Sequence, residues 1–337
     1  MSLSGKLFQY ARRSSLGYFL RTTAQKSSLL SPIFKFAVQR AIDYKYPRSL
    51  NIEPTSYCNL KCVMCPRDRT NKKDGYIEMK LFRKIVDEAQ SYGPRSVVLH
   101  KDGEPLLHKE IIEMIKYIKY SNRAHNILIS SNGLLLNDEL SRELVRSGLD
   151  QLHLSIGAVN AESYKKVRGG DLNKLEEKIL RLIEIKKEEN SKTPELITQI
   201  IKMPQTVKEV DNFRKKWKKL GMKVRTQELR HWAGGIEGSA SKTAPKKHPC
   251  HALWFAPSIN WDGKVSACCF DWDEQVVIGD INTHTLSEIW QSKAIEEYRK
   301  FHINGEYSRI ALCSKCDHYL DYSDLWFWWQ KSKPKQK

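Results

Sequence analysis

Strand-like and helix-like segments alternate along the middle of this chain, and this alternation limits the folds open to it. Short apolar segments read as strands, and segments with apolar residues three and four apart lie between them. Strands that alternate with helices pair in parallel through right-handed crossovers. Six repeats are too few to close an eight-stranded barrel, so we predict an α/β fold, an open, partial (β/α)6 TIM-like barrel. The expected strands are 49–54, 96–100, 126–130, 151–156, 196–203 and 223–229, and the expected helices are 79–92, 109–120, 139–147, 172–189 and 207–220.

Three cysteines follow the first expected strand. Cys58, Cys62 and Cys65 are separated by three and then two residues. Thiolates at this spacing can each bind one iron of a four-iron, four-sulfur cluster, which leaves the fourth iron open to a chelating ligand. Zinc is the alternative, although a structural zinc site takes four ligands and the sequence offers no fourth one nearby.

Other polar or glycine-bearing segments also follow expected strands. Residues 101–105 come after the second strand, residues 130–133 after the third, and residues 168–170 lie in the segment before the fifth. In parallel barrels ligands bind at the carboxyl ends of the strands. We therefore expect these segments to share one edge of the sheet with the cysteines.

A second set of cysteines lies in the C-terminal third. After a linker at 233–249, a hairpin is expected from strands 253–259 and 264–268, with a turn at Asp262-Gly263. Four thiolates can saturate another four-iron cluster, which suggests electron transfer, and a four-thiolate zinc site is the alternative. Cys269 could replace Cys268 as a ligand, donate a hydrogen atom to a substrate, or be an inert buried thiol. The four expected ligands are Cys250, Cys268, Cys313 and Cys316.

The cysteine triplet and the strand-end segments together resemble the radical S-adenosylmethionine (SAM) superfamily. The second cysteine set resembles the SPASM and twitch extensions of that superfamily, and the absence of any cysteine after Cys316 favours the twitch form with one auxiliary cluster. The spacing of the second cysteine set is similar to that of the auxiliary-cluster cysteines in the butirosin-pathway aminocyclitol dehydrogenase. The resemblance implies two 4Fe-4S clusters and SAM bound at the first of them.

The resemblance also implies which residues contact SAM. Glu104 is expected to accept from the SAM amino group, and Arg168 to pair with the SAM carboxylate. Met64 is expected near the adenine, or as a core residue. Ser130, Ser131 and Asn132 match a ribose-contacting segment, and an aspartate replaces the first glycine of the Gly-Gly-Glu-Pro segment. The expected contacts are Met64, Asp102, Gly103, Glu104, Pro105, Ser130, Ser131, Asn132 and Arg168.

The function implied is that of a radical SAM oxidoreductase. It would dehydrogenate a small polar substrate such as a sugar, an aminocyclitol or a glycan precursor, with the auxiliary cluster accepting an electron and flavodoxin or ferredoxin supplying electrons. Arg230 and His231, just past the sixth strand, are candidate general bases, or else a solvated arginine and a capping histidine. The alternatives are a peptide maturase or epimerase and an RNA-modifying protein.

Charge and composition add expectations about the two ends. The net charge is +18, and residues 1–48 are basic with a helical pattern that could cap the barrel, contact a membrane surface, or serve as a transit peptide. No apolar run is long enough to cross a bilayer. Clustered cysteines without a secretory segment indicate a reducing cytoplasm.

The expected units are 49–232 for the barrel, 250–322 for the auxiliary domain, and 323–337 for an aromatic, then basic tail. That tail could anchor the chain end or stack on bases, but we do not expect a nucleic-acid partner.

Overall fold

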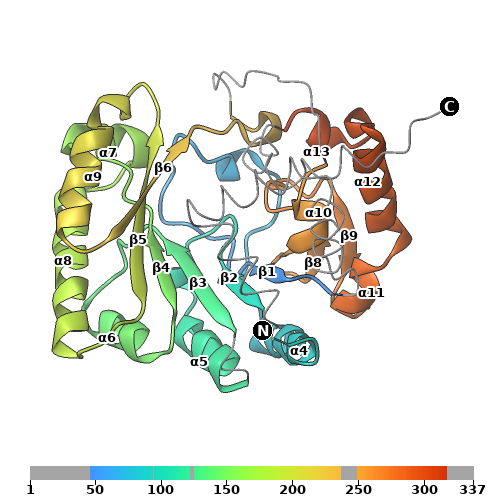
Figure 1. The fold of residues 1–337 in the computed structure, drawn as a ribbon, viewed down its shortest axis with the longest axis horizontal. Coiled ribbons are helices and arrows are strands. Elements are labelled where there is room, and N and C mark those ends of the chain that lie inside the picture. The colour runs from blue at the N-terminus through green and yellow to red at the C-terminus, as the bar shows by residue number, and fades with distance from the viewer. Residues whose placement is uncertain (1–45, 94, 122–124, 237–248, 317–337) are drawn as a thin grey trace, which may run out of the picture.

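The computed structural model describes residues 46–93, 95–121, 125–236 and 249–316, and one nine-stranded sheet runs through them (Figure 1). The strand order is β6-β5-β4-β3-β2-β1-β7-β8-β9. The first six strands are parallel and follow chain order, which confirms the expected α/β partial barrel. They are β1 (Ser49–Ile52), β2 (Ser96–Leu99), β3 (Asn126–Ser131), β4 (Gln151–Leu154), β5 (Glu195–Lys202) and β6 (Lys223–Glu228).

Alternation along the strands places apolar side chains under the helices. Leu50 and Ile52 of β1 are fully buried, as are Leu99 of β2 and Ile129 of β3. They share one core with helix residues such as Ile115, so burial of apolar area holds the helices on the sheet. The helices are α4 (Met79–Gln90), α5 (Ile111–Ser121), α6 (Asp138–Arg146), α7 (Ala161–Arg168), α8 (Leu172–Glu188) and α9 (Val210–Lys219), with 3-10 turns η1 (Arg67–Arg69), η2 (Pro105–Leu107), η3 (Val207–Glu209) and η4 (Trp232–Gly234).

Helix α7 is absent from the sequence-based prediction, which left residues 161–168 in a loop. Its surface is largely polar, so its apolar period is weak, and its ends carry the clearer signal. The Asn160 side chain accepts from the amides of Glu162 and Ser163, which caps the first turn. Gly169, with φ of +79°, ends the helix in the left-handed conformation that glycine adopts without strain. Arg168 therefore ends a helix and does not lie in a loop.

The C-terminal region extends the same sheet. Strand β7 (Ser258–Ile259) pairs in parallel with β1, and β8 (Lys264–Ser266) and β9 (Val277–Asp280) follow in antiparallel order. The expected strand at 253–259 is wrong in its first half, because Ala252–Phe255 form the short helix α10. Leu253 and Trp254 are both buried, which a helical turn allows and a strand with one solvent face does not. The guanidinium of Arg299 donates to the Leu253 carbonyl at 2.9 Å and stabilises this turn.

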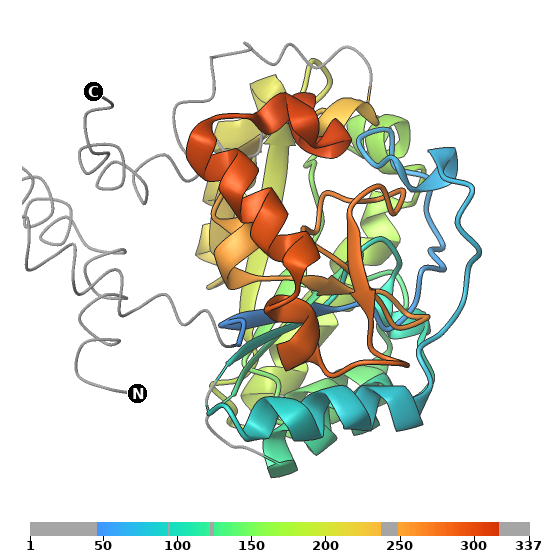
Figure 2. The same ribbon diagram turned by 90° about the vertical axis from the view of Figure 1, so that its right-hand side faces the viewer.

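The barrel and the C-terminal region share one hydrophobic core. Ile259, Val265 and Trp290 belong to the same buried cluster as the barrel strands. Glu88 of α4 accepts from the amides of Leu286 and Ser287, both at 2.8 Å, and so caps α11. Figure 2 shows the C-terminal helices on the flank that carries β7 to β9. They are α11 (Leu286–Trp290), α12 (Lys293–Asn304) and α13 (Ala311–Ser314), with η5 (Tyr307–Arg309) between the last two.

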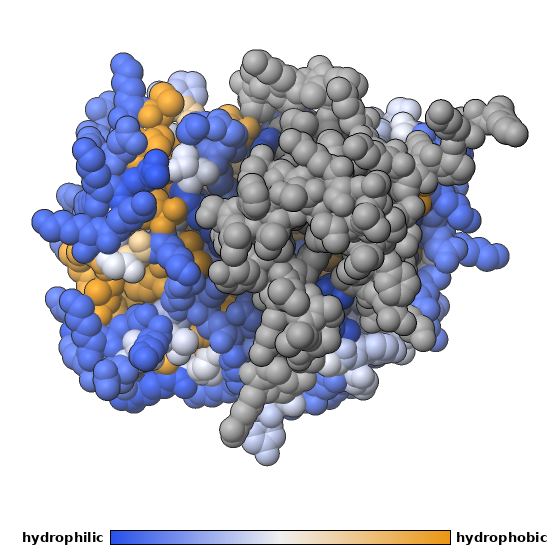
Figure 3. Space-filling view, in the orientation of Figure 1, coloured by the Kyte–Doolittle hydropathy of each residue, from blue (hydrophilic) through white to orange (hydrophobic). Residues whose placement is uncertain are grey.

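The surface view adds the outer faces of the helices. Figure 3 shows that the described part of this face is largely hydrophilic, with most of its hydrophobic colour on the left, where Figure 1 places α8 and α9. Among the described residues, no helix combines the length and apolarity that a bilayer span requires. The predictions for the basic N-terminal segment, most of the linker and the aromatic tail lie outside the described residues.

Candidate active site

The cysteine loop follows β1 at the carboxyl edge of the sheet. Its backbone is joined to the loop after β2, because the Glu104 amide donates to the Tyr57 carbonyl at 2.8 Å. Gly103 permits this approach, since a Cβ atom there would lie 2.1 Å from the Thr55 carbonyl oxygen. A side chain at this position would force the two loops apart. The glycine therefore sets the distance between the cysteine loop and the segment 101–105.

The first three cysteines are close enough for their charges to interact. Burial, together with the charges of Cys62, Asp102 and Cys58, raises the pKa of Cys65 to about 12. Burial also raises the pKa of Cys58. Thiolates in such a place are favourable only when a positively charged metal centre balances them, so the donor set fits a metal-bound state.

A single metal ion and a four-iron cluster place different demands on these thiols. Within the described ranges, no three side chains of Cys, His, Asp or Glu converge closely enough to hold a single metal ion. A four-iron cluster places a different demand on its ligands, because each thiolate binds a separate iron. The three cysteines would hold three corners of such a cluster.

Arg168 lies beside the cysteine loop. Its Nη1 donates to the Cys62 sulfur at 3.5 Å, and only 8% of the residue is exposed. Its Nε atom is buried and has no hydrogen-bond partner among the described residues. A buried guanidinium with an unused donor suits a carboxylate, which can accept two parallel hydrogen bonds from it. This arrangement fits the expected pairing of Arg168 with the SAM carboxylate.

Glu104 connects the loops after β2 and β3. Its carboxylate accepts from the Ser131 hydroxyl and the Asn132 amide, both at 2.7 Å, and from the Leu106 amide at 3.1 Å. Burial raises its pKa, and these three hydrogen bonds oppose that shift. Ser131 and Asn132 are brought together with Glu104, as the sequence indicated. Two carboxylate oxygens can accept about four hydrogen bonds, so one site is left for a ligand donor.

We expect Glu104→Gln to lower the free energy of unfolding by about 1–3 kcal/mol. The amide that replaces one oxygen cannot accept a hydrogen bond, so a buried donor at Ser131, Asn132 or Leu106 loses its partner. Chemical denaturation measures the change. Glu162→Gln, on the exposed face of α7, is the control and should change stability by less than about 0.5 kcal/mol. Equal stability of Glu104→Gln and wild type would contradict this role for the carboxylate.

The structure also gives the neighbours of three further residues that were expected to contact SAM. Asn132 also donates from its side chain to Asn59 at 2.7 Å, and this residue of the cysteine loop was missed because a lone exposed asparagine carries no motif. Met64 is buried against Val167 and Met203, as its alternative reading as a core residue requires. Ser130 lies on β3 next to Ser131. A contact of Met64 with adenine and a contact of Ser130 with ribose both remain predictions.

The aspartate that replaces the first glycine of the motif belongs to a buried charge network. The Asp102 carboxylate lies 3.1 Å from Lys72 Nζ and 3.3 Å from Lys101 Nζ. Lys101 also donates to the Asn260 side chain, which follows β7, at 2.8 Å. The buried Glu53 accepts from the Asp102 amide at 3.3 Å. The side chain of Asp102 is therefore occupied within the protein, and contacts of its backbone and of Pro105 with SAM remain predictions.

The second cysteine set gathers around the end of β8. Burial raises the pKa of Cys250, and the charges of Cys316, Cys313 and Cys269 raise it further, so these thiols lie near one another. Cys268 and Cys269 share a side-chain hydrogen bond, which raises the pKa of Cys268 and lowers that of Cys269. Cys250, Cys268, Cys313 and Cys316 fit a fully ligated metal centre by donor type and proximity. The choice between Cys268 and Cys269 stays open.

The two candidate bases lie after β6. His231 caps η4, because its Nδ1 accepts from the Gly234 amide at 3.1 Å. This contact matches the alternative reading of a capping histidine. Arg230 and His231 are both partly exposed, and their catalytic role remains a prediction.

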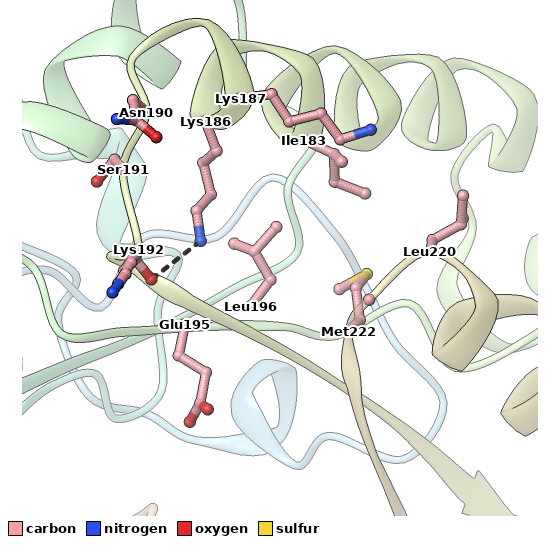
Figure 4. A pocket seen from close by; sticks show the side chains of 11 residues that line it. Ile183, Lys186, Lys187, Asn190, Ser191, Lys192, Glu195, Leu196, Leu220 and Met222 are labelled. Atoms are coloured by element: carbon pink, nitrogen blue, oxygen red, sulfur yellow. Dashed lines mark hydrogen bonds between the residues drawn. The ribbon is translucent and has the colours of Figure 1, made fainter.

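A surface cavity of about 580 Å³ lies at the opposite edge of the sheet (Figure 4). Its lining includes Glu195, where β5 begins, and Met222, just before β6. The Lys186 ammonium reaches across it to the Pro194 carbonyl at 2.5 Å. Residues at the amino ends of barrel strands serve stability, so we do not assign the reaction to this cavity.

Comparison with known proteins agrees with this geometry. A partial barrel with three thiols at its carboxyl edge and four more beside it defines an iron–sulfur enzyme of the SAM-binding type. The radical SAM superfamily matches residues 52–216, and the SPASM iron–sulfur cluster-binding domain matches residues 250–317. The chain belongs to the radical SAM superfamily and carries a SPASM region. These two domains imply 4Fe-4S clusters, and solved structures of similar fold contain AdoMet.

Curated relatives match part of the chain. A probable GTP 3′,8-cyclase of Methanococcus vannielii is 31% identical over 137 residues, which cover 40% of this chain and 45% of that protein. A tungsten-containing aldehyde ferredoxin oxidoreductase cofactor-modifying protein of Pyrococcus furiosus is 27% identical over 175 residues, which cover 51% and 49%. The chain spans about half the length of these relatives.

Solved structures share the fold at low identity. BtrN in complex with AdoMet and 2-DOIA is 18% identical with a TM-score of 0.57, and the match covers 80% of this chain and 92% of BtrN. Streptococcus suis SuiB bound to precursor peptide SuiA is 15% identical with a TM-score of 0.63, covering 85% and 75%. At these identities the likeness concerns the fold.

Proposed function

We propose that this protein is a radical SAM oxidoreductase that dehydrogenates an alcohol of a small polar substrate, such as a sugar, an aminocyclitol or a glycan precursor. The observation that carries the proposal is a second group of thiols, in which Cys250 interacts with Cys313 and Cys316 and packs in one cluster with Cys268, just after the β7–β8 hairpin that pairs with β1. Four thiolates can saturate a cluster and leave it no substrate position, which suits it to accept an electron.

Within the proposal, the first cluster with bound SAM supplies the radical chemistry that removes one hydrogen atom from a carbinol carbon. A base would then take the hydroxyl proton, and an auxiliary cluster held by Cys250, Cys268, Cys313 and Cys316 would supply the acceptor for one electron, so that the alcohol would lose two electrons in all and become a ketone. Arg168, Glu104 and the β3 loop would hold SAM. Of the two candidate bases, His231 would take the proton, because the Arg230 guanidinium stays protonated. A flavodoxin or ferredoxin would supply the electrons that start the reaction.

The test is Cys313→Ala in the anaerobically reconstituted protein. We expect iron to fall from about eight to about four per chain, because one of two four-iron clusters is lost. SAM cleavage should persist, while conversion of an alcohol to a ketone should stop. Iron analysis and mass spectrometry of the products measure these outcomes. About four irons in the wild type, or unchanged ketone formation by the variant, would overturn the proposal.

A peptide substrate is the second candidate, and one observation favours it. Strand β6 is an edge of the sheet, and its side chains are mostly exposed. An edge strand can add an extended peptide through backbone hydrogen bonds. The neighbour SuiB is bound to a precursor peptide. SAM cleavage stimulated by extended peptides and by no small alcohol would favour this candidate.

A further inference from the structure

Three polar side chains lie at one level on adjacent strands inside the barrel. Ser130 of β3 pairs with His153 of β4. His100 directly follows Leu99, whose partner on β3 is Ile129, so His100 stands next to Ser130. Their chain neighbours Leu99, Ile129, Leu152 and Leu154 are fully buried in the core with the helices. Because side chains alternate along a strand, His100, Ser130 and His153 face the opposite, inner side.

Both histidines carry a buried nitrogen without a partner. His100 Nδ1 and His153 Nε2 make no hydrogen bond with any described residue. A buried polar atom that lacks a partner costs about 1–3 kcal/mol, so such atoms are uncommon unless a ligand or water satisfies them. Two such atoms on the strands that flank β3, near the strand ends that carry the SAM-contacting segments, point toward a bound molecule.

The charge state of the two rings limits what that molecule can be. Burial, together with the charges of Arg225 and His100, lowers the pKa of His153 to about 4. Burial also lowers the pKa of His100, although the charge of Asp102 opposes this shift. Near neutral pH both rings are therefore uncharged, and each has one donor and one acceptor. Such a pair suits hydroxyl groups, which both donate and accept, better than a phosphate or carboxylate.

We propose that His100, Ser130 and His153 form a binding site for the hydroxyl groups of an uncharged polyhydroxylated substrate. The site rests on the proposed function and narrows its substrate class to neutral polyols and sugars. Ser130 directly precedes Ser131 and Asn132 in the chain. A ligand held at this site would therefore be next to the SAM-binding edge. The three residues act as binding residues and are distinct from the candidate bases Arg230 and His231.

The test is isothermal titration of the anaerobically reconstituted full chain, saturated with SAM, with myo-inositol, glucose and N-acetylglucosamine as probes. We expect at least one probe to bind, and His100→Leu and His153→Leu each to weaken binding tenfold or more. His100→Asn and His153→Gln place an amide where the unpartnered ring nitrogen lies, so each should recover most of the affinity. These two variants keep the test valid if a leucine variant fails to fold.

His125→Leu is the matched control. It also removes a buried imidazole, but His125 lies just before β3, at the opposite edge of the sheet. The His125→Leu variant should bind the probe with the same affinity as the wild type. Failure of all three probes to bind, or equal binding by the leucine variants, would overturn the proposed site. Absence of SAM cleavage in the wild type would instead overturn the proposed function, so the two failures are distinguishable.

Discussion

Replacing Cys62 with Ala is expected to abolish reductive cleavage of SAM. Three thiolates can hold three irons of the first cluster, and loss of one leaves two irons without protein ligands, which makes the cluster labile. Cys62 also accepts the hydrogen bond from Arg168 Nη1, so the variant removes the contact that places this guanidinium beside the cluster. The measurement is the amount of 5′-deoxyadenosine and methionine formed by the reconstituted protein under reduction.

Cys313→Ala is the matched control for this experiment, because it removes a thiol from the other site and should keep SAM cleavage. If Cys62→Ala cleaved SAM at a rate within about tenfold of the wild type, the activation free energy would differ by only about 1.4 kcal/mol. That result would contradict the assignment of Cys62 as a cluster ligand.

Lys101→Met is expected to lower the free energy of unfolding by about 3–5 kcal/mol, the usual cost of breaking a buried ion pair. The Lys101 side chain is only 1% exposed and lies 3.3 Å from the Asp102 carboxylate. Burial alone would lower its pKa, but the charges of Asp102, Glu53 and Asp271 outweigh burial and raise it. Methionine would leave these buried carboxylates with less positive charge to balance them.

The same substitution should weaken SAM binding, because Asp102 begins the segment that carries Gly103 and Glu104. A lysine whose pKa is raised on folding stabilises the protein fully below its unfolded pKa of about 10.4, and that stabilisation is lost only as pH rises further. The stability difference between wild type and Lys101→Met should therefore be constant from about pH 7 to 10. Denaturant unfolding at several pH values measures it.

Lys166→Met is the control for the loss of one lysine. Lys166 pairs with Glu162 on α7, but these side chains are 63% and 75% exposed. Solvent screens such a pair, so its removal should change stability by less than about 0.5 kcal/mol. A loss below about 1 kcal/mol for Lys101→Met would show that the buried network does not depend on its central cation.

The sequence predicted those parts of the site that depend on local patterns of residues. Short apolar segments between helix-like ones located the six barrel strands, and the spacing of Cys58, Cys62 and Cys65 located the loop after β1. Polar segments at strand ends were then placed on one edge by the parallel topology alone. The same local reasoning failed for α7, whose apolar period is weak, and for residues 253–259, where a run of apolar residues fits a helical turn as well as a strand.

The sequence by itself thus determined the class of fold, the two groups of thiols and the edge of the sheet where they lie, because periodicity and spacing act over a few residues. Only the tertiary structure decided that β7 joins β1, that Lys101 is buried between Asp102 and Asn260, and that His100 and His153 stand on either side of Ser130. These features join residues far apart in the chain. Their contacts depend on strand register and on burial, which no local pattern encodes.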